Sequence, residues 1–314
     1  MRNAFTKRLC EIAAKNNNII IITNDAPTPA FLEFKEKLPS RFINAGLAEA
    51  NMTGMAAGLA LSGKIPITYS IIPFVVMRCY EQVRDDVCYQ NVNVKIIGIG
   101  GGIVYSTLGG THTALEDISM MRALPNMTVI SPADPMEAIK TADAIIDYKG
   151  PVYVRLARTG DPVLYKKDYQ FKIGKAVTMK RGKDVAIIGY GPILARALAA
   201  ADELEKQGIS VEVINMHTLK PLDERKVVET IKRTRALVTI EEHSIIGGIY
   251  SAIVEVMARY QLNIPIAGIA LKDEFLTNYG KQTEILDTLG FSIGDIKKTI
   301  KQIYAKKKRI FENN

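Results

Sequence analysis

Short apolar runs alternate with amphipathic stretches along almost the whole chain. Continuous β-branched runs bounded by polar or glycine-containing segments are typical of buried strands in a parallel sheet. They predict strands within residues 19–23, 64–69, 92–99, 128–134, 151–158, 184–191, 210–215, 236–240 and 264–270. Helical spacing of apolar positions predicts helices over residues 2–15, 74–89, 135–148, 192–206, 223–233 and 248–260, with others starting near 49 and 114. Strands that alternate with helices in this way indicate an α/β fold with doubly wound sheets.

A polar, irregular stretch divides this pattern in two. It covers residues 166–183, with only a short strand expected around residues 171–178. A chain of 314 residues is also long enough for two domains. We therefore expect a doubly wound N-terminal domain over residues 1–165, with a mostly parallel sheet, and a Rossmann-like C-terminal domain over residues 184–314.

Composition is that of a soluble globular protein, with 47% hydrophobic and 24% charged residues. The net charge of +8 comes partly from a basic C-terminal tail. No nucleic-acid-binding module accompanies this tail, so we expect the solvated end of a last helix and no nucleic-acid partner. No apolar run approaches the roughly 18 residues of a membrane span, and the N-terminus is no signal peptide. The three cysteines lack metal-ligand spacing and fit reduced thiols, so we expect a cytoplasmic protein without a metal site of its own.

Residues 41–60 hold a single carboxylate, Glu49, at the start of a helix of small residues. Glycine and alanine around it let another backbone or a flat ligand approach closely, and a carboxylate there is poorly solvated. These residues alone leave two interpretations open. Glu49 either complements the helix dipole in the first turn or belongs to a binding site.

Polar residues follow several expected strands at their carboxyl ends, which is where open α/β sheets bind ligands. Asp25 could contact a ligand there or cap the next helix. His112 lies in a glycine-rich loop, an unusual place for a core histidine, so we expect it to be a site residue. Arg158 fits an anion or a surface salt bridge, and His243 could reach a neighbouring site.

Two glycine clusters also follow strands, at residues 100–102 and 189–191. Neither continues as the GxGxxG pattern that leads into a helix in dinucleotide-binding proteins, so the signal for a dinucleotide is weak. In the second cluster the third glycine is replaced by Leu194, and no acidic residue closes the next strand. We expect the second cluster to serve tight strand-to-helix packing.

Taken together, the motifs of this chain resemble those of the transketolase family. Residues 41–60 resemble the family segment in which a carboxylate precedes a small-residue helix, and residues 109–112 look like its D-G-P-T-H loop. Residues 121–134 look like its R-x-(I/L)-P-N…P-A-D segment, and residues 218–223 and 241–248 are similar to its C-terminal domain. The resemblance covers essentially the whole chain in order. It corresponds to the second half of a transketolase, a pyrimidine-binding domain followed by the C-terminal domain.

The resemblance implies thiamine diphosphate (TPP) as the cofactor. Glu49 matches the family carboxylate that bonds to N1′ of the aminopyrimidine and favours the tautomer whose 4′-nitrogen abstracts the C2 proton. Phe74 matches an aromatic residue beside the pyrimidine ring, while Ile71 and Met77 stand where the family has other ring neighbours. Asp25 matches a family aspartate at the edge of the cofactor.

The resemblance also implies contacts with a sugar substrate. His112 matches a histidine that contacts the donor and could relay protons, and Arg158 matches an arginine that binds a terminal phosphate. His243 is a further substrate-binding candidate. Two positions depart from the family pattern, because Gly100 stands where a histidine is common and Leu108 replaces an aspartate that reads the acceptor's C2 hydroxyl. Loss of such polar partners weakens recognition of a hydroxyl, so we expect ketol transfer with a non-standard acceptor.

One part of the family pattern is absent from the sequence. Family members hold the diphosphate and its metal with a Gly-Asp-Gly…Asn motif, and no Gly-Asp-Gly occurs in this chain. The resemblance therefore implies an N-terminal partner subunit that binds Mg²⁺ or Ca²⁺. The expected assembly is an α₂β₂ heterotetramer in which this chain also associates with itself.

Three alternatives remain beside this interpretation. The β subunit of a TPP-dependent 2-oxo acid dehydrogenase or a deoxyxylulose-phosphate-synthase-like enzyme shares the layout, but the loop at residues 109–112 favours transketolase. A non-catalytic partner subunit would explain Gly100 and Leu108, but not Glu49 and His112. An NAD-dependent dehydrogenase is disfavoured because the dinucleotide fingerprint is missing.

Overall fold

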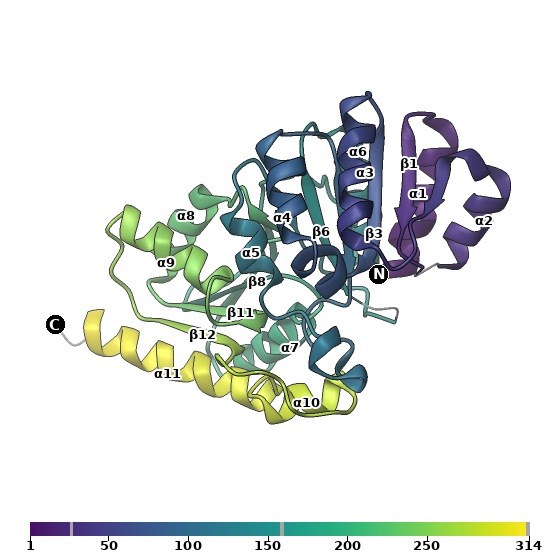
Figure 1. Ribbon diagram of the computed structural model, residues 1–314. Helices are drawn as coiled ribbons and strands as arrows, with labels where there is room; N and C mark the ends of the chain where they lie inside the picture. The colour runs from purple at the N-terminus through teal and green to yellow at the C-terminus, as the bar shows by residue number, and fades with distance from the viewer. Residues whose placement is uncertain (26–27, 158–159, 312–314) are drawn as a thin grey trace.

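The computed structural model describes residues 1–25, 28–157 and 160–311. Figure 1 shows an N-terminal half, coloured from purple to teal, that lies against a C-terminal half coloured from green to yellow. Each half is built on one mostly parallel sheet with helices packed against it. The expected α/β class with two doubly wound halves is confirmed. Among the described helices, none combines the length and apolar character needed to cross a membrane.

The first sheet has seven strands in the order β10-β5-β6-β4-β3-β1-β2. All its neighbouring pairs are parallel except β10 with β5. Its strands are β1 (Ile19–Thr23), β2 (Phe42–Asn44), β3 (Ile65–Ile71), β4 (Lys95–Ile99), β5 (Thr128–Ile130), β6 (Val152–Leu156) and β10 (Thr218–Lys220). Its helices are α1 (Arg2–Lys15), α2 (Pro29–Lys37), α3 (Glu49–Leu61), α4 (Tyr80–Gln82), α5 (Asp117–Ala123) and α6 (Pro135–Asp147).

The second sheet has five strands in the order β12-β11-β8-β9-β7, with only the β7–β9 pair antiparallel. Its strands are β7 (Val177–Lys180), β8 (Val185–Gly189), β9 (Val211–Asn215), β11 (Leu237–Ser244) and β12 (Ile266–Leu271). Its helices are α7 (Leu194–Glu205), α8 (Glu224–Thr234), α9 (Ile249–Arg259), α10 (Gln282–Thr288) and α11 (Ile293–Phe311). The basic tail noted in the sequence is the solvated end of α11.

Both faces of the first sheet are covered, which explains its continuous apolar strands. Ile19 and Ile21 of β1 face a core shared with α1, α2 and α6. Ile20 and Ile22 face the opposite core, where Met52 of α3 also packs. Alternate residues of a strand point to opposite faces, so a strand covered on both sides is apolar throughout.

The two halves share this second core. The cluster that holds Ile20 and Met52 also holds Ile188 of β8 and Ile253 of α9. The halves are therefore joined by a continuous hydrophobic layer, which fixes the C-terminal half against the loops at one edge of the first sheet.

Two local expectations were wrong, and one short strand was missed. The helix expected over residues 74–89 is broken into a π-helical turn (Pro73–Met77), the short α4, and a second π-helical segment (Val83–Tyr89). The expected strand at residues 171–178 starts only at Val177, because a turn with Gly174 at φ +79° precedes it. The short β10 was not foreseen, because three residues carry too weak a pattern to reveal pairing with a distant strand.

Candidate functional site

Glu49 is the first residue of α3 and is almost completely buried, with 2% of its surface exposed. The side-chain amide of Asn24, directly after β1, donates to Glu49 Oε1 at 2.7 Å. Arg78 Nη1 donates to Glu49 Oε2 at 3.1 Å. The carboxylate therefore has a partner on each oxygen and lies at the positive end of a helix.

These partners decide the charge of Glu49. Desolvation by burial acts to raise its pKa, but hydrogen bonds from backbone N–H, from Asn24 and from Arg78 outweigh it and hold the pKa below the ordinary value. Glu49 is thus an ionised carboxylate at neutral pH that is enclosed by protein. Such a group polarises a hydrogen-bonded ligand strongly, because little water competes for it.

Phe74 and His112 extend this group toward solvent. The guanidinium of Arg78 lies over the Phe74 ring at 4.7 Å from its centroid, and its side chain is 54% exposed. The rings of Phe74 and His112 meet edge to face, with centroids 5.2 Å apart. Glu49, Arg78, Phe74 and His112 therefore form one contiguous row that starts at a buried carboxylate and ends at the surface.

The topology explains why these residues meet. β1, β3 and β4 are parallel neighbours, so the loops at their carboxyl ends lie along one edge of the sheet. The loop after β1 carries Asn24, the π-helical turn after β3 carries Phe74, and the loop after β4 carries His112. In the π-helical turn the N–H of Arg78 bonds to the carbonyl of Pro73 at 3.1 Å, five residues back. Such turns are frequent at functional sites.

Two predicted ring neighbours, Ile71 and Met77, and the predicted cofactor-edge residue Asp25 have other contacts. Ile71 is half-buried against the core beneath α1, α2 and α6, and Met77 is half-buried against the core shared by both halves. Asp25 is exposed at φ +66° and exchanges two hydrogen bonds with the side chain of Asn44, both at 3.1 Å. Their roles toward a cofactor stay predictions. Arg158 lies outside the described residues.

His243 does not join this row. It is fully buried at the end of β11, and Nδ1 lies 2.8 Å from the carbonyl of Ser244. Burial lowers its pKa to about 4, so the imidazole is neutral. Nε2 finds no hydrogen-bond partner among the described residues. Its substrate-binding role stays a prediction that this placement does not support.

The glycines at residues 100–102 accommodate side chains. A Cβ at Gly100 would lie 2.2 Å from the Tyr105 ring, and one at Gly101 would lie 2.8 Å from the Arg155 guanidinium. A Cβ at Gly102 would lie 2.4 Å from a carboxylate oxygen of Glu242. The space beside these three glycines is therefore occupied by side chains of the chain itself.

The second glycine cluster serves packing, as expected. A Cβ at Gly189 would lie 2.5 Å from Ile240 on the neighbouring β11 and 3.2 Å from Leu194 of α7. Such close approach is possible only for glycine. In the described part of the chain, no group of three or more His, Cys, Asp or Glu side chains is arranged to hold a metal ion.

The row fits a flat nitrogen heterocycle. The guanidinium of Arg78 is itself planar and nitrogen-rich, and it contacts both the Phe74 ring and the Glu49 carboxylate. An aminopyrimidine needs the same two partners, an aromatic face and a carboxylate at ring nitrogen. Asn24 Oδ1, buried without a hydrogen-bond partner in the described structure, offers an additional acceptor.

Sequence reasoning missed Asn24 and Arg78. Asn24 is the first residue after β1, at the ligand-binding edge, but it was passed over in favour of the charged Asp25. Arg78 follows Met77, and the regular helix expected from residue 74 gave no reason to place Arg78 beside Glu49. The signal that the sequence offered was a basic residue, Arg78, directly after the segment that carries Phe74.

Comparison with known proteins gives the same family for both halves. The family model described as "Transketolase, pyrimidine binding domain" matches residues 1–160, and "Transketolase, C-terminal domain" matches residues 174–296. The chain is 39% identical over 287 residues to a 6-deoxy-6-sulfo-D-fructose transketolase subunit of Clostridium sp., covering 90% of this chain and 89% of that protein. It is 35% identical over 307 residues to an apulose-4-phosphate transketolase subunit of Phocaeicola vulgatus, covering 97% of both.

Solved structures agree with these matches. A structure titled "Split gene transketolase, inactive beta4 tetramer" superposes with a TM-score of 0.88 at 35% identity and covers 98% of both chains. Transketolase from Campylobacter jejuni shares the fold, with a TM-score of 0.77 at 20% identity over 96% of this chain and 46% of that one. The chain therefore belongs to the transketolase family, as a subunit of the split type in which the pyrimidine-binding and C-terminal domains form one polypeptide.

Proposed function

We propose that this chain is the C-terminal subunit of a two-chain, TPP-dependent transketolase. It transfers a two-carbon ketol unit from a ketose donor to an aldose or aldehyde acceptor. The buried, ionised Glu49 beside Phe74 is the observation that carries the proposal, because it offers the carboxylate that activation of an aminopyrimidine requires. The names of the two similar subunits, from Clostridium sp. and Phocaeicola vulgatus, support it.

When bound, TPP supplies a nucleophilic carbon that the side chains of a protein lack. Glu49 would hold the pyrimidine through a hydrogen bond to ring nitrogen, in surroundings that exclude water. Phe74 would pack against the ring, with Ile71 and Met77 as further apolar neighbours and Asp25 at the edge. Asn24 fixes the orientation of the Glu49 carboxylate.

His112 acts on the substrate side. Its ring contacts Phe74, and Nδ1 lies 3.0 Å from the hydroxyl of Thr111, which leaves Nε2 to hold or transfer a proton at a substrate oxygen. Arg158 binds the terminal anion of the sugar. His243 has the least structural support among the proposed substrate-binding residues, because its side chain is fully buried.

Acceptor specificity departs from that of ordinary sugar-phosphate transketolases. Leu108, on the same loop as His112, has a side chain that is 54% exposed and offers no hydrogen bond to an acceptor hydroxyl. The two similar subunits are named for 6-deoxy-6-sulfo-D-fructose and apulose 4-phosphate, which supports an unusual substrate.

The assembly follows from what the chain contains. An N-terminal subunit carries the diphosphate-binding residues and the metal, Mg²⁺ or Ca²⁺, in an α₂β₂ heterotetramer in the cytoplasm. A related structure is titled an inactive β4 tetramer, which supports self-association of this type of chain without activity.

Reconstitution with the N-terminal subunit tests the proposal. Donor and acceptor panels, phosphorylated and not, are expected to give ketol transfer with an unusual acceptor preferred, and preference for ordinary pentose phosphates would refute that specificity. Glu49→Gln is expected to lower turnover by about 100-fold or more. Unchanged turnover in this variant would show that the chain is a non-catalytic partner.

A second candidate function has one observation in its favour. The chain is 34% identical over 308 residues to 1-deoxy-D-xylulose-5-phosphate synthase of Listeria monocytogenes, but spans only 50% of that protein. Release of CO₂ from pyruvate by the reconstituted pair would favour this activity, or a 2-oxo acid dehydrogenase, over ketol transfer.

A further inference from the structure

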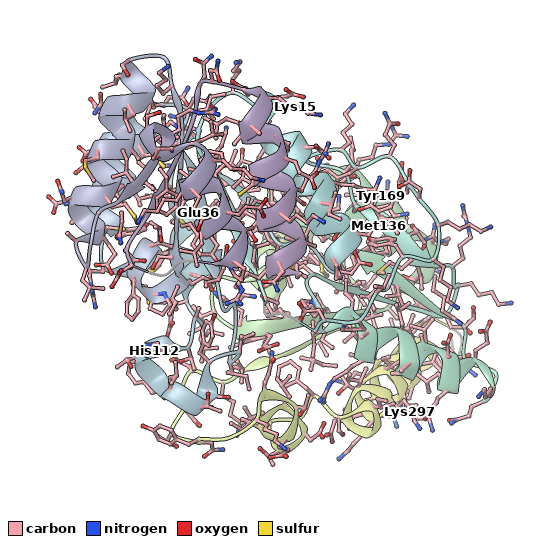
Figure 2. All side chains as sticks on the ribbon, turned by 90° about the vertical axis from the view of Figure 1, so that its right-hand side faces the viewer. Lys15, Glu36, His112, Met136, Tyr169 and Lys297 are labelled. Atoms are coloured by element: carbon pink, nitrogen blue, oxygen red, sulfur yellow. The ribbon has the colours of Figure 1, made fainter. Side chains whose placement is uncertain are left out.

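The loop that carries His112 rests on the C-terminal half. We call residues 106–112 the substrate loop and residues 275–282 the buttress segment, which lies between β12 and α10 and includes the first residue of α10. Ser106 Oγ donates to the carbonyl of Gly280 at 2.8 Å. Figure 2 shows His112 beside the yellow-green ribbon of the C-terminal half.

Tyr279 of the buttress segment also contacts the substrate loop. Its ring lies against Gly109, so closely that a Cβ there would be 2.8 Å from both Cε1 and the hydroxyl oxygen. Gly109 has φ +84°, a conformation that other residues rarely adopt. Apart from this contact Tyr279 is largely exposed, at 73%.

A second anchor holds the base of the substrate loop. Glu242 Oε1, at the end of β11, accepts the backbone N–H of Ile103 at 2.8 Å. The same oxygen accepts the side-chain amide of Gln282 at 2.7 Å, and Oε2 accepts it at 3.0 Å. Gly102 leaves the space that this carboxylate occupies. The buried carboxylate of Glu242 therefore bonds both to Ile103, three residues before the substrate loop, and to Gln282, at the end of the buttress segment.

The substrate loop needs such support. It consists of two short 3₁₀ turns, Ser106–Leu108 and Gly110–His112, separated by Gly109. Short turns of this kind hold few internal hydrogen bonds, so external contacts fix their conformation. Tyr279 contacts Gly109, which separates the two turns and lies three residues before His112.

We propose that Tyr279 is a positioning residue, through which the C-terminal half holds His112 against Phe74. This inference rests on the proposed function, because it assigns His112 to the substrate side of the site. The ring of Tyr279 limits the movement of Gly109 by steric contact, and the hydroxyl is not required for this role. A misplaced catalytic group loses much of its effect even when it moves by only about 1 Å.

The kinetic test uses the reconstituted complex. Tyr279→Ala is expected to lower kcat/KM for the donor by about tenfold. Tyr279→Phe should keep the wild-type value, and the affinity for TPP should be unchanged in both variants. Phe275→Ala is the matched control, since this ring lies in the same segment and is 87% exposed. In a His112→Ala background, Tyr279→Ala is expected to have no further effect. Additive losses would overturn the proposal, because they would show that Tyr279 does not act through His112.

A structural test does not depend on the reaction. Hydrogen exchange of residues 103–112 in the isolated chain is expected to become faster in Tyr279→Ala, but not in Tyr279→Phe or Phe275→Ala. Unchanged exchange would overturn the proposal even if the enzyme were active. Failure of the proposed function would appear instead as absent ketol transfer by the wild-type complex, and the exchange result would then decide the positioning role alone.

Discussion

Glu137 gives the sharpest prediction about stability. It lies in the first turn of α6, fully buried, and Figure 2 shows Tyr169 beside that turn, where Met136 is labelled. Its carboxylate accepts hydrogen bonds from the Ala133 N–H at 2.6 Å, from the Asn215 amide at 2.8 Å, and from the hydroxyls of Tyr165 and Tyr169. Burial raises the pKa of Glu137 to about 7 in spite of these donors. Ionisation of Glu137 should therefore destabilise the wild type as pH rises. The Glu137→Gln variant has no ionisable group at this position and should lack that loss of stability.

The magnitude follows from proton linkage. The pKa of about 7 in the folded chain lies above the ordinary value of 4.5, so the native state binds more protons between these values. The free energy of unfolding therefore falls as pH rises through this window. At 1.36 kcal/mol per pKa unit the full effect is about 3 kcal/mol, of which about 2.5 kcal/mol falls between about pH 5 and about pH 8.

Urea unfolding measures this effect. The chain has no tryptophan, so circular dichroism of the helices is the suitable signal. From about pH 5 to about pH 8, Glu137→Gln should gain about 2.5 kcal/mol relative to wild type. Burial also lowers the pKa values of His217 and His243 to about 4, but both proteins contain them, so their effect cancels. Glu36→Gln, at an exposed position of α2, is the control and should show no such change.

Two results would refute this reasoning. A constant difference between Glu137→Gln and wild type would mean that the hydrogen-bond donors offset burial and leave the carboxylate at its ordinary pKa. A wild type that gains stability over the variant as pH rises would mean that the donors outweigh burial.

Two further predictions concern single contacts. Arg78→Ala removes the ion pair with Glu49, so the pKa of Glu49 should rise. Carboxyl NMR of the isolated chain measures this pKa, and an unchanged value would exclude a role for the ion pair. Gly102→Ala, at φ +73°, should destabilise the chain by about 3 kcal/mol or more in urea unfolding, because its Cβ meets Glu242. Gly63→Ala, at φ +87° with no atom of the described structure within 4 Å of its Cβ, should cost only about 1 kcal/mol, so equal costs would contradict the clash.

The sequence was sufficient for the fold class and for the burial of Glu49, whose role as a site residue came from the family resemblance and stays a prediction. The pattern of apolar and polar residues is a local property, and both faces of β1 are covered, so its run of four isoleucines was informative. Small residues around Glu49 likewise indicated poor solvation, and the residue is 2% exposed. These predictions needed no knowledge of which segments meet.

The partners of Glu49 could not be predicted in this way. Asn24 and Arg78 lie 25 and 29 residues from it, on different elements. Arg78 reaches it only because a π-helical turn replaces the regular helix expected from residue 74. A one-residue change in helical register moves a side chain by about 100° around the axis, which no periodicity argument resolves.

The segment at residues 241–248 shows a different limit. The sequence places it at the end of a strand, where both structural and functional residues occur, and His243 was the natural candidate because histidine is chemically versatile. In the structure His243 is enclosed, while its neighbour Glu242 reaches into the space left by Gly102 and bonds to Ile103. An acidic residue buried at the junction of the two halves is costly unless it is paired. Glu242 is paired with Ile103 and Gln282, so the C-terminal half helps to hold the segment that leads to His112 on the substrate side of the site.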